Sequence, residues 1–403
     1  MKQWTLKSKI VVILFAGILP FTYVNCVGEK FQPLTQQVAT LASGGSEPAA
    51  TPQPLTGIMV PMVMAQGHMG RTLMSCDDGK TWIHDLSDSS TLICFGPASD
   101  PNSIDCDHDA RAGHGIDFGD GYFYTNFGWG YNGSVRRSKD GVHWDTVKTG
   151  GWGSGLAYAK NSLFLFWSWA YQKNGFLSDD QGMTWRDRDA SQVLDNAFLD
   201  HLSVQRSGNY IALLDSGSGI ALSSDGAKTW IQPSSFLPSW ASNAQFAVGK
   251  NRMVVVGYQT AADFSTSTLN VAISTDMGLT WNLNPPTVIQ GYIVGSNLLF
   301  DGNKFIFWTA GKMWTSTDAI TWQTKDLDSA NQGSVRWAQG PVVVTPSGTF
   351  VSIPSNWGSF YANQQAYRST DGITWDLLDA NHFKGSHPVS KLINATIDSS
   401  YCK

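Results

Sequence analysis

Short runs of apolar residues, four to eight long, alternate along most of this chain with stretches rich in Gly, Asn, Asp and Ser. Runs of that length are typical of strands, and runs with little alternation are typical of strands packed on both faces. The runs come in sets of four, which predicts three consecutive four-stranded sheets in the middle of the chain. We expect their strands at 155–160, 162–169, 175–178 and 184–187; at 201–207, 209–215, 220–223 and 229–232; and at 244–250, 252–259, 270–274 and 280–283.

One turn sequence recurs between the third and fourth run of each set. Its long form is Ser-x-Asp-x-Gly-x-Thr-Trp, with Ala227 in place of Gly in one copy, and its short form lacks one residue. The seven copies begin at Ser75, Ser138, Ser178, Ser223, Ser274, Ser316 and Ser369. A unit repeated at this spacing is the signature of a repeat architecture, so the chain is predicted to fold as seven similar sheets.

The chemistry of this turn is local. Ser and Asp side chains accept hydrogen bonds from the backbone of a tight turn, and Gly supplies the positive φ that such a turn needs. We expect the Trp that follows to place its ring between neighbouring sheets. The seven aspartates are therefore interpreted as turn residues rather than as catalytic acids.

The repeated turn resembles the Asp-box, or BNR repeat, over residues 57–380. Proteins with this motif include sialidases, xyloglucan-degrading enzymes, sorting-receptor propellers and photosystem assembly factors. The resemblance implies an all-β fold, a seven-bladed β-propeller with four-stranded antiparallel blades, spanning 57–403. It leaves the chemistry open. The first repeat is one strand short, and the segment 389–397 is expected to supply the missing inner strand and close the ring.

The N-terminal residues are typical of export. Lys2, Lys7 and Lys9 precede an apolar run at 10–21, which predicts a signal peptide over 1–25. Cys26 resembles the acylated cysteine of a bacterial lipoprotein, and residues 26–56 read as a flexible linker. This predicts a lipoprotein at the outer membrane or cell surface; with ordinary signal cleavage the protein would instead be periplasmic or secreted. The net charge of −5 argues against nucleic acid as a partner.

Four cysteines remain beyond Cys26, which suits an oxidising compartment. Of the three possible pairings we favour Cys94–Cys106 with Cys76–Cys402. No Cys-x-x-Cys pair occurs, and Asp105, Asp107 and Asp109 lack the spacing of a cation-binding loop, so neither a metal nor another cofactor is expected.

In the resembled propellers the ligand site lies on the face away from the Asp-boxes, and the loops expected on that face are rich in aromatic residues. Flat rings beside amides suit sugars, which present an apolar C–H face and several hydroxyls. Core packing between blades is the alternative for some rings, above all for Trp167. The expected glycan-contacting rings are Trp129, Tyr131, Trp169, Tyr171, Trp357 and Tyr361.

Polar residues concentrate in the long connection 84–113 and near the start of the fourth set. The expected ligand-binding residues there are His108, Arg111, His114 and His201, and the candidate catalytic acids are Asp107, Asp109 and Asp200. Asp107 or Asp109 with Asp200 would be an acid–base pair for glycoside hydrolysis. The alternative is a solvated loop whose aspartates stabilise turns.

A sialidase mechanism is disfavoured. Arg136-Arg137-Ser138 resembles a sialidase repeat, but no Arg-Ile-Pro precedes the repeats, and the only glutamates are Glu29 and Glu47, both ahead of the repeats. A tyrosine–glutamate pair cannot form within the repeats. Three hypotheses remain: a tethered, monomeric protein that binds a glycan or glycoconjugate, a glycoside hydrolase with aspartate chemistry, and a protein-interaction scaffold in the cell envelope.

Overall fold

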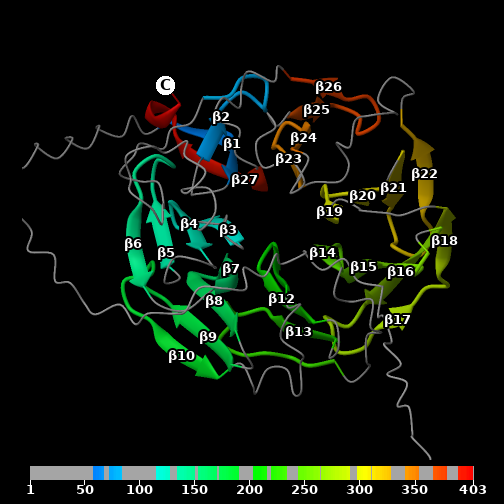
Figure 1. Ribbon diagram of the computed structural model, residues 1–403, viewed down its shortest axis with the longest axis horizontal. Helices are drawn as coiled ribbons and strands as arrows, with labels where there is room; N and C mark the ends of the chain where they lie inside the picture. Colours follow the sequence, from blue (N-terminus) through cyan, green and yellow to red (C-terminus); the bar gives the residue numbers. More distant parts are fainter. Residues whose placement is uncertain are drawn as a thin grey trace, which may run out of the picture.

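The computed structural model is a seven-bladed β-propeller, in which seven antiparallel sheets surround a central axis (Figure 1). It describes residues 58–67, 72–83, 115–127, 134–149, 153–169, 172–189, 203–215, 219–233, 244–263, 265–290, 297–309, 311–327, 341–353, 366–378 and 389–402. Within these ranges there is no α-helix, and a 3₁₀ turn at Ser399–Tyr401 is the one helical element. No helix in the described part is long and apolar enough to cross a membrane.

The strands of each blade follow one another from the axis outward. Blade 1 comprises β27 (Val389–Asp398), β1 (Met59–Gly67) and β2 (Thr72–Ser75). Blade 2 comprises β3 (Gly115–Gly119), β4 (Tyr122–Phe127), β5 (Ser134–Ser138) and β6 (Asp145–Thr149). Blade 3 comprises β7 (Gly153–Ala159), β8 (Ser162–Trp169), β9 (Gln172–Ser178) and β10 (Arg186–Asp189). Blade 4 comprises β11 (Ser203–Ser207), β12 (Tyr210–Asp215) and β13 (Gly219–Ser223).

The other three blades continue the pattern. Blade 5 comprises β14 (Gln245–Gly249), β15 (Arg252–Thr260), β16 (Thr266–Ser274), β17 (Asn282–Leu283) and β18 (Thr287–Gln290). Blade 6 comprises β19 (Leu299–Phe300), β20 (Phe305–Thr309), β21 (Lys312–Ser316) and β22 (Gln323–Asp326). Blade 7 comprises β23 (Val342–Val344), β24 (Phe350–Ser352), β25 (Tyr367–Ser369) and β26 (Asp376–Leu377). In blades 1 and 4 the outermost strand is reduced to single bridges, Met74↔Ile83 and Leu222↔Ile231.

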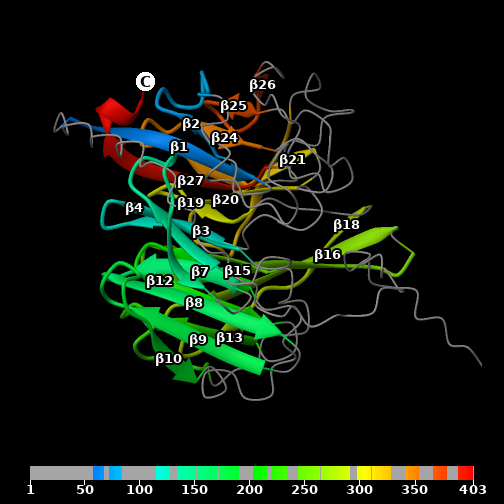
Figure 2. The same ribbon diagram turned by 60° about the vertical axis from the view of Figure 1, so that its left-hand side comes forward.

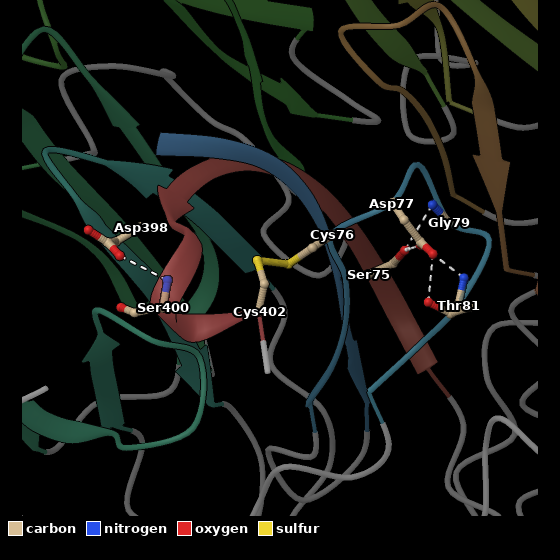
Figure 3. The surroundings of a disulfide bond; sticks show 8 residues. All are labelled: Ser75, Cys76, Asp77, Gly79, Thr81, Asp398, Ser400 and Cys402. Atoms are coloured by element: carbon tan, nitrogen blue, oxygen red, sulfur yellow. Dashed lines mark hydrogen bonds between the residues drawn. A yellow bond between two sulfur atoms is a disulfide. The ribbon is translucent and has the colours of Figure 1, made fainter. Parts of the chain in front are cut away.

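The ring closes as the sequence predicts, by pairing the two ends of the chain. β27 runs antiparallel to β1 along its whole length, from Met59↔Asp398 to Gly67↔Val389. The predicted disulfide Cys76–Cys402 joins the first repeated turn to the residue after the 3₁₀ turn, across a sequence separation of 326 (Figure 3). Both contacts hold blade 1 together from opposite ends of the sequence.

Seven hydrophobic clusters fill the seven gaps between neighbouring sheets, and each contains one of the repeated tryptophans. Trp82, for example, packs with Val63 of blade 1 and Val351 of blade 7. In six turns the indole N–H also donates to the backbone carbonyl three residues earlier, at 2.9–3.2 Å. The prediction that these rings lie between sheets is confirmed.

The seven turns share one hydrogen-bond pattern. In every copy the N–H of the residue before Trp donates to the aspartate Oδ1 at 2.8–2.9 Å. The long form has two successive residues with positive φ, as at Asp78 (59°) and Gly79 (78°), whereas the short form has one, as at Gly141 (77°). The long turn therefore accommodates its additional residue by placing it in the left-handed conformation.

These turns lie on one face of the propeller, which we name the turn face; the opposite face is the loop face. Each turn also packs against the preceding blade. A Cβ added at Gly278 would lie 2.1 Å from Leu222 Cδ1 of blade 4, so this position excludes any side chain. The turns therefore connect blades as well as strands.

Blade 5 departs from the prediction. β15 and β16 extend to Thr260 and back from Thr266, beyond the predicted 252–259 and 270–274, and β18 adds a fifth strand on β16. Figure 2 shows the far ends of β16 and β18 projecting beyond the other strands. The sequence 287–290 follows two prolines and is only four residues long, so its pattern gave no strand signal.

Candidate functional site

Side chains of the inner strands join neighbouring blades around the axis. Gln205 of β11 accepts from the Phe246 N–H and donates to the Ala244 carbonyl of blade 5, both at 2.8 Å. Asn297 of blade 6 makes the same pair of bonds to Val342 of blade 7, at 2.8 and 2.6 Å. These side chains satisfy backbone groups that the innermost strand of each sheet would leave open. The wall around the axis is thereby rigid.

Asp117 connects three blades at once. Its carboxylate accepts from the Tyr158 N–H of β7 at 2.7 Å and from the Phe118 N–H at 2.8 Å. Arg206 of β11 binds it with two bonds, Nε to Oδ2 at 2.7 Å and Nη2 to Oδ1 at 2.6 Å. Asp117 is only 4% exposed, and its charge raises the pKa of Arg206. This two-bonded ion pair is structural, since every oxygen of the carboxylate is occupied.

A channel along the axis contains two adjoining cavities. The larger, about 600 Å³, lies toward the turn face, and the smaller, about 380 Å³, lies toward the loop face. Rings and polar groups mix in the larger cavity, which is lined by Phe118, Phe300, Phe350, Arg206, Asp301, Asn394 and Thr396. Cavities of this size and mixed lining suit small polar ligands that also present an apolar face.

Phe300, Val344 and Asn394 line both cavities and so mark the centre of the channel. The Asn394 Nδ2 donates to the Val344 carbonyl of blade 7, which fixes the amide. Its Oδ1 is buried and has no hydrogen-bond partner in the described structure. A buried acceptor without a partner is unfavourable.

Lys391 lines the smaller cavity, and burial lowers the pKa of its ammonium group. Its cross-strand neighbour is Gln66, whose Oε1 accepts from the Thr125 hydroxyl at 2.8 Å. The Gln66 Nε2 is buried without an acceptor among the described residues. The loop-face end of blade 1 thus holds two donor groups, the Gln66 amide and the Lys391 amine.

The aspartates of the repeated turns are occupied by the turns themselves. The Thr184 and Thr280 hydroxyls and N–H groups hold the pKa of Asp180 and of Asp276 at about 2. At Asp77 burial is the largest single effect and opposes the shift, yet the hydrogen bonds together lower the pKa. Groups with such pKa values stay ionised at neutral pH and are poor proton donors.

Most of the predicted site residues lie outside the described residues. These are Asp107, His108, Asp109, Arg111, His114, Trp129, Tyr131, Tyr171, Asp200, His201, Trp357 and Tyr361, with Cys26, Cys94 and Cys106. Trp169 is the last residue of β8 and pairs with Gln172 at the loop-face end of blade 3; its side chain is outside the description. The predicted aspartate pair and the predicted aromatic contacts therefore stay predictions.

Sequence reasoning missed the residues that the structure does bring together. Asp301 is the one carboxylate that lines the two described cavities, and its Oδ1 accepts from the Asn303 and Lys304 N–H groups at 2.8 Å. The described residues contain no group of three or more potential metal ligands. The two described cavities therefore present one carboxylate, whereas a glycosidase site of the two-carboxylate kind needs a pair.

Comparison with solved structures finds the same fold in proteins of very different sequence. A putative 6-phosphogluconolactonase from Bacteroides fragilis superimposes with a TM-score of 0.53 at 10% identity, over 86% of this chain and 100% of the other. A protein from Lactobacillus plantarum gives 0.50 at 9% identity, over 84% and 100%. A Hadza microbial sialidase gives 0.35 at 15% identity, over 64% and 66%, which is too distant to support an argument. No family model matches the sequence, and no curated protein matches it.

Proposed function

We propose that this protein is an exported, membrane-tethered β-propeller that binds carbohydrate in its axial channel. The observation that carries the proposal is the centre of the channel, where Phe300 and Asn394 line both cavities and the Asn394 Oδ1 is buried without a hydrogen-bond partner among the described residues. A pyranose offers a C–H face to an aromatic ring and a hydroxyl donor to an amide oxygen.

The sequence supports the same proposal. The aromatic loops at 126–132, 167–172 and 355–361 belong to connections at the loop-face ends of their blades, where a glycan would enter the channel. We assign the repeated turns as Asp-boxes, on their hydrogen bonds and left-handed residues, and Cys26 as the lipid-attachment residue. Trp129, Tyr131, Trp169, Tyr171, Trp357 and Tyr361 are then the rings that extend the site beyond the channel.

Hydrolysis of the bound glycan would need Asp107 or Asp109 with Asp200, and no contact in the described structure favours it over binding alone. The same holds for a polypeptide ligand in an envelope scaffold. The glycan-binding proposal therefore stands first because it alone uses the channel groups described above.

Glycan-array screening followed by calorimetry tests the proposal. Asn394→Ala removes the amide oxygen and Phe300→Ala removes the ring; each is expected to weaken binding of the selected glycan at least tenfold. Asn282→Ala, on the exposed outer strand of blade 5, is the matched control and should bind as the parent does. Parent-like affinity in both channel variants would rule out the channel as the site, and release of reducing ends would show an enzyme instead.

A further inference from the structure

Exposed apolar side chains gather on the turn face. Nine large hydrophobic side chains in the described structure are between 47% and 64% exposed. Four of them lie in a repeated turn: Met183, Met277, Leu279 and Ile320. Leu283 and Leu377 lie two residues after the Trp of a turn, and Ile58 and Met59 lie where the chain enters the propeller and β1 begins. Val288 of β18 is the exception. Single exposed aliphatic residues are ordinary, but a gathering on one face calls for an explanation.

The turn itself does not require apolar residues at these positions. The residue between Gly (or Ala227) and Thr in the long form is Lys80, Met183, Lys228 or Leu279 in the four copies. Two copies therefore carry a lysine where two carry an exposed hydrophobic side chain, with the same backbone hydrogen bonds in all four. The apolar residues are a property of this surface and not of the motif.

The densest part of this surface lies across blades 5 and 6. Met277 and Leu279 belong to one turn, Leu283 follows that turn in β17, and Ile320 belongs to the next turn. The side chain of Asn284, the residue after Leu283, donates to the Ile320 carbonyl at 3.2 Å. This contact brings Leu283 close to Ile320, while the Met277 Sδ accepts from the Tyr210 hydroxyl of blade 4 at 3.8 Å. We name Met277, Leu279, Leu283 and Ile320 the blade 5–6 patch.

The N-terminal segment enters the propeller on the same face. In blade 1 Val63 pairs with Ser75, the first residue of the turn, so Met59 to Met62 extend past the start of that turn. In Figure 3, β1 runs beyond the turn at Ser75 toward the disulfide. Residues 1–57 precede this point and include the apolar run 10–21 and Cys26. The tether of the proposed lipoprotein therefore enters the propeller on the turn face.

We propose that the turn face docks on the lipid bilayer, with the blade 5–6 patch inserted among the headgroups and the loop face directed outward. Apolar side chains gain free energy when they leave water for the interfacial region. The seven turn aspartates keep their negative charge on this face. We therefore expect it to dock on a zwitterionic bilayer and to be repelled by an anionic bilayer. This inference goes beyond glycan binding and shares with it only the exported location.

Vesicle co-sedimentation tests the docking. The chain 26–403 with Cys26→Ser, which cannot be acylated, is mixed with phosphatidylcholine vesicles. We expect it to bind, the Met277→Ser/Leu279→Ser/Ile320→Ser variant to bind at least tenfold more weakly, and added phosphatidylglycerol to weaken the binding of both. Val288→Ser, which removes an equally exposed side chain elsewhere, is the matched control and should bind as the parent does.

A second measurement locates the contact. A polarity-sensitive dye on Leu279→Cys should shift to the blue on vesicles, while the same dye on Val288→Cys should not shift. Failure of the Cys26→Ser chain to bind vesicles, or equal loss in the Val288→Ser control, would overturn the proposal. Binding of a soluble glycan is expected to be the same with and without vesicles, so failure of docking and failure of the glycan site are told apart.

Discussion

Removing the Cys76–Cys402 disulfide is predicted to lower the free energy of unfolding without changing the fold. The bond closes a loop of about 326 residues, nearly the whole propeller. For a loop of this length, the chain-entropy relation gives a stabilisation of about 6 kcal/mol through the unfolded state. The native state should survive, because β27 keeps its backbone pairing with β1 over the full strand.

Urea unfolding of the parent and of the Cys76→Ser/Cys402→Ser variant measures this quantity. With a slope of about 3 kcal/mol per molar urea, a loss of 6 kcal/mol moves the midpoint down by about 2 M. We expect a shift of 1 to 2 M, on the order of half to all of that value, with an unchanged far-UV spectrum. The slope should stay the same, apart from a small change due to the more expanded unfolded chain.

The predicted Cys94–Cys106 bond gives an internal comparison. A loop of about 12 residues yields about 3 kcal/mol by the same relation, half the effect of the long loop. Equal midpoints for the parent and the Cys76→Ser/Cys402→Ser variant would refute the reasoning, since closure would then depend on strand pairing alone. Loss of the β-sheet signal in the far-UV spectrum of the variant would also refute the reasoning, because it would show that β27 does not stay paired with β1 without the disulfide.

Three further predictions concern the turns and the axis. Asp117→Asn leaves Arg206 without its carboxylate and should lower the free energy of unfolding by about 2–4 kcal/mol, as measured by urea; no measurable loss would mean that the pair is not a structural link. Gly278→Ala places an alanine in a left-handed conformation and brings its Cβ within 2.1 Å of Leu222, whereas Gly302→Ala only places an alanine in a left-handed conformation. The melting temperature should therefore fall further for Gly278→Ala, and equal falls would contradict the packing argument. Because two of the turn aspartates have a pKa of about 2, below the unfolded value, the stability they provide is complete above about pH 4 and is lost as the pH falls toward 2. The melting temperature followed by circular dichroism should therefore fall across that window, and an unchanged melting temperature would contradict the prediction.

The fold was predictable because its information is local and repeated. Each turn carries its own Ser, Asp, left-handed residue and Trp within eight positions, so one copy explains seven. The pairing of 389–397 with the first repeat followed from a missing strand, and Cys402 fitted the same closure. Even the assignment of the aspartates as turn residues needed only the physics of a short backbone segment.

The channel was not predictable, because its residues are distant in sequence and ordinary in type. Asp117 and Arg206 are 89 positions apart, and nothing in either local sequence marks an ion pair. Asp117 follows the polar connection 84–113 closely in sequence, yet it is buried between three inner strands. Asn394 and Phe300 line the same cavities only through the circular order of blades 1, 7 and 6.

The pairing of β27 with β1 also sets an order of events during synthesis. The first strand of the propeller must wait for the last, since Met59–Gly67 finds its inner partner only when residue 398 has left the ribosome. Any chain that stops early keeps that edge uncovered, together with an unpaired Cys76 thiol. A truncated product would therefore expose a strand edge and a thiol that the full-length protein covers.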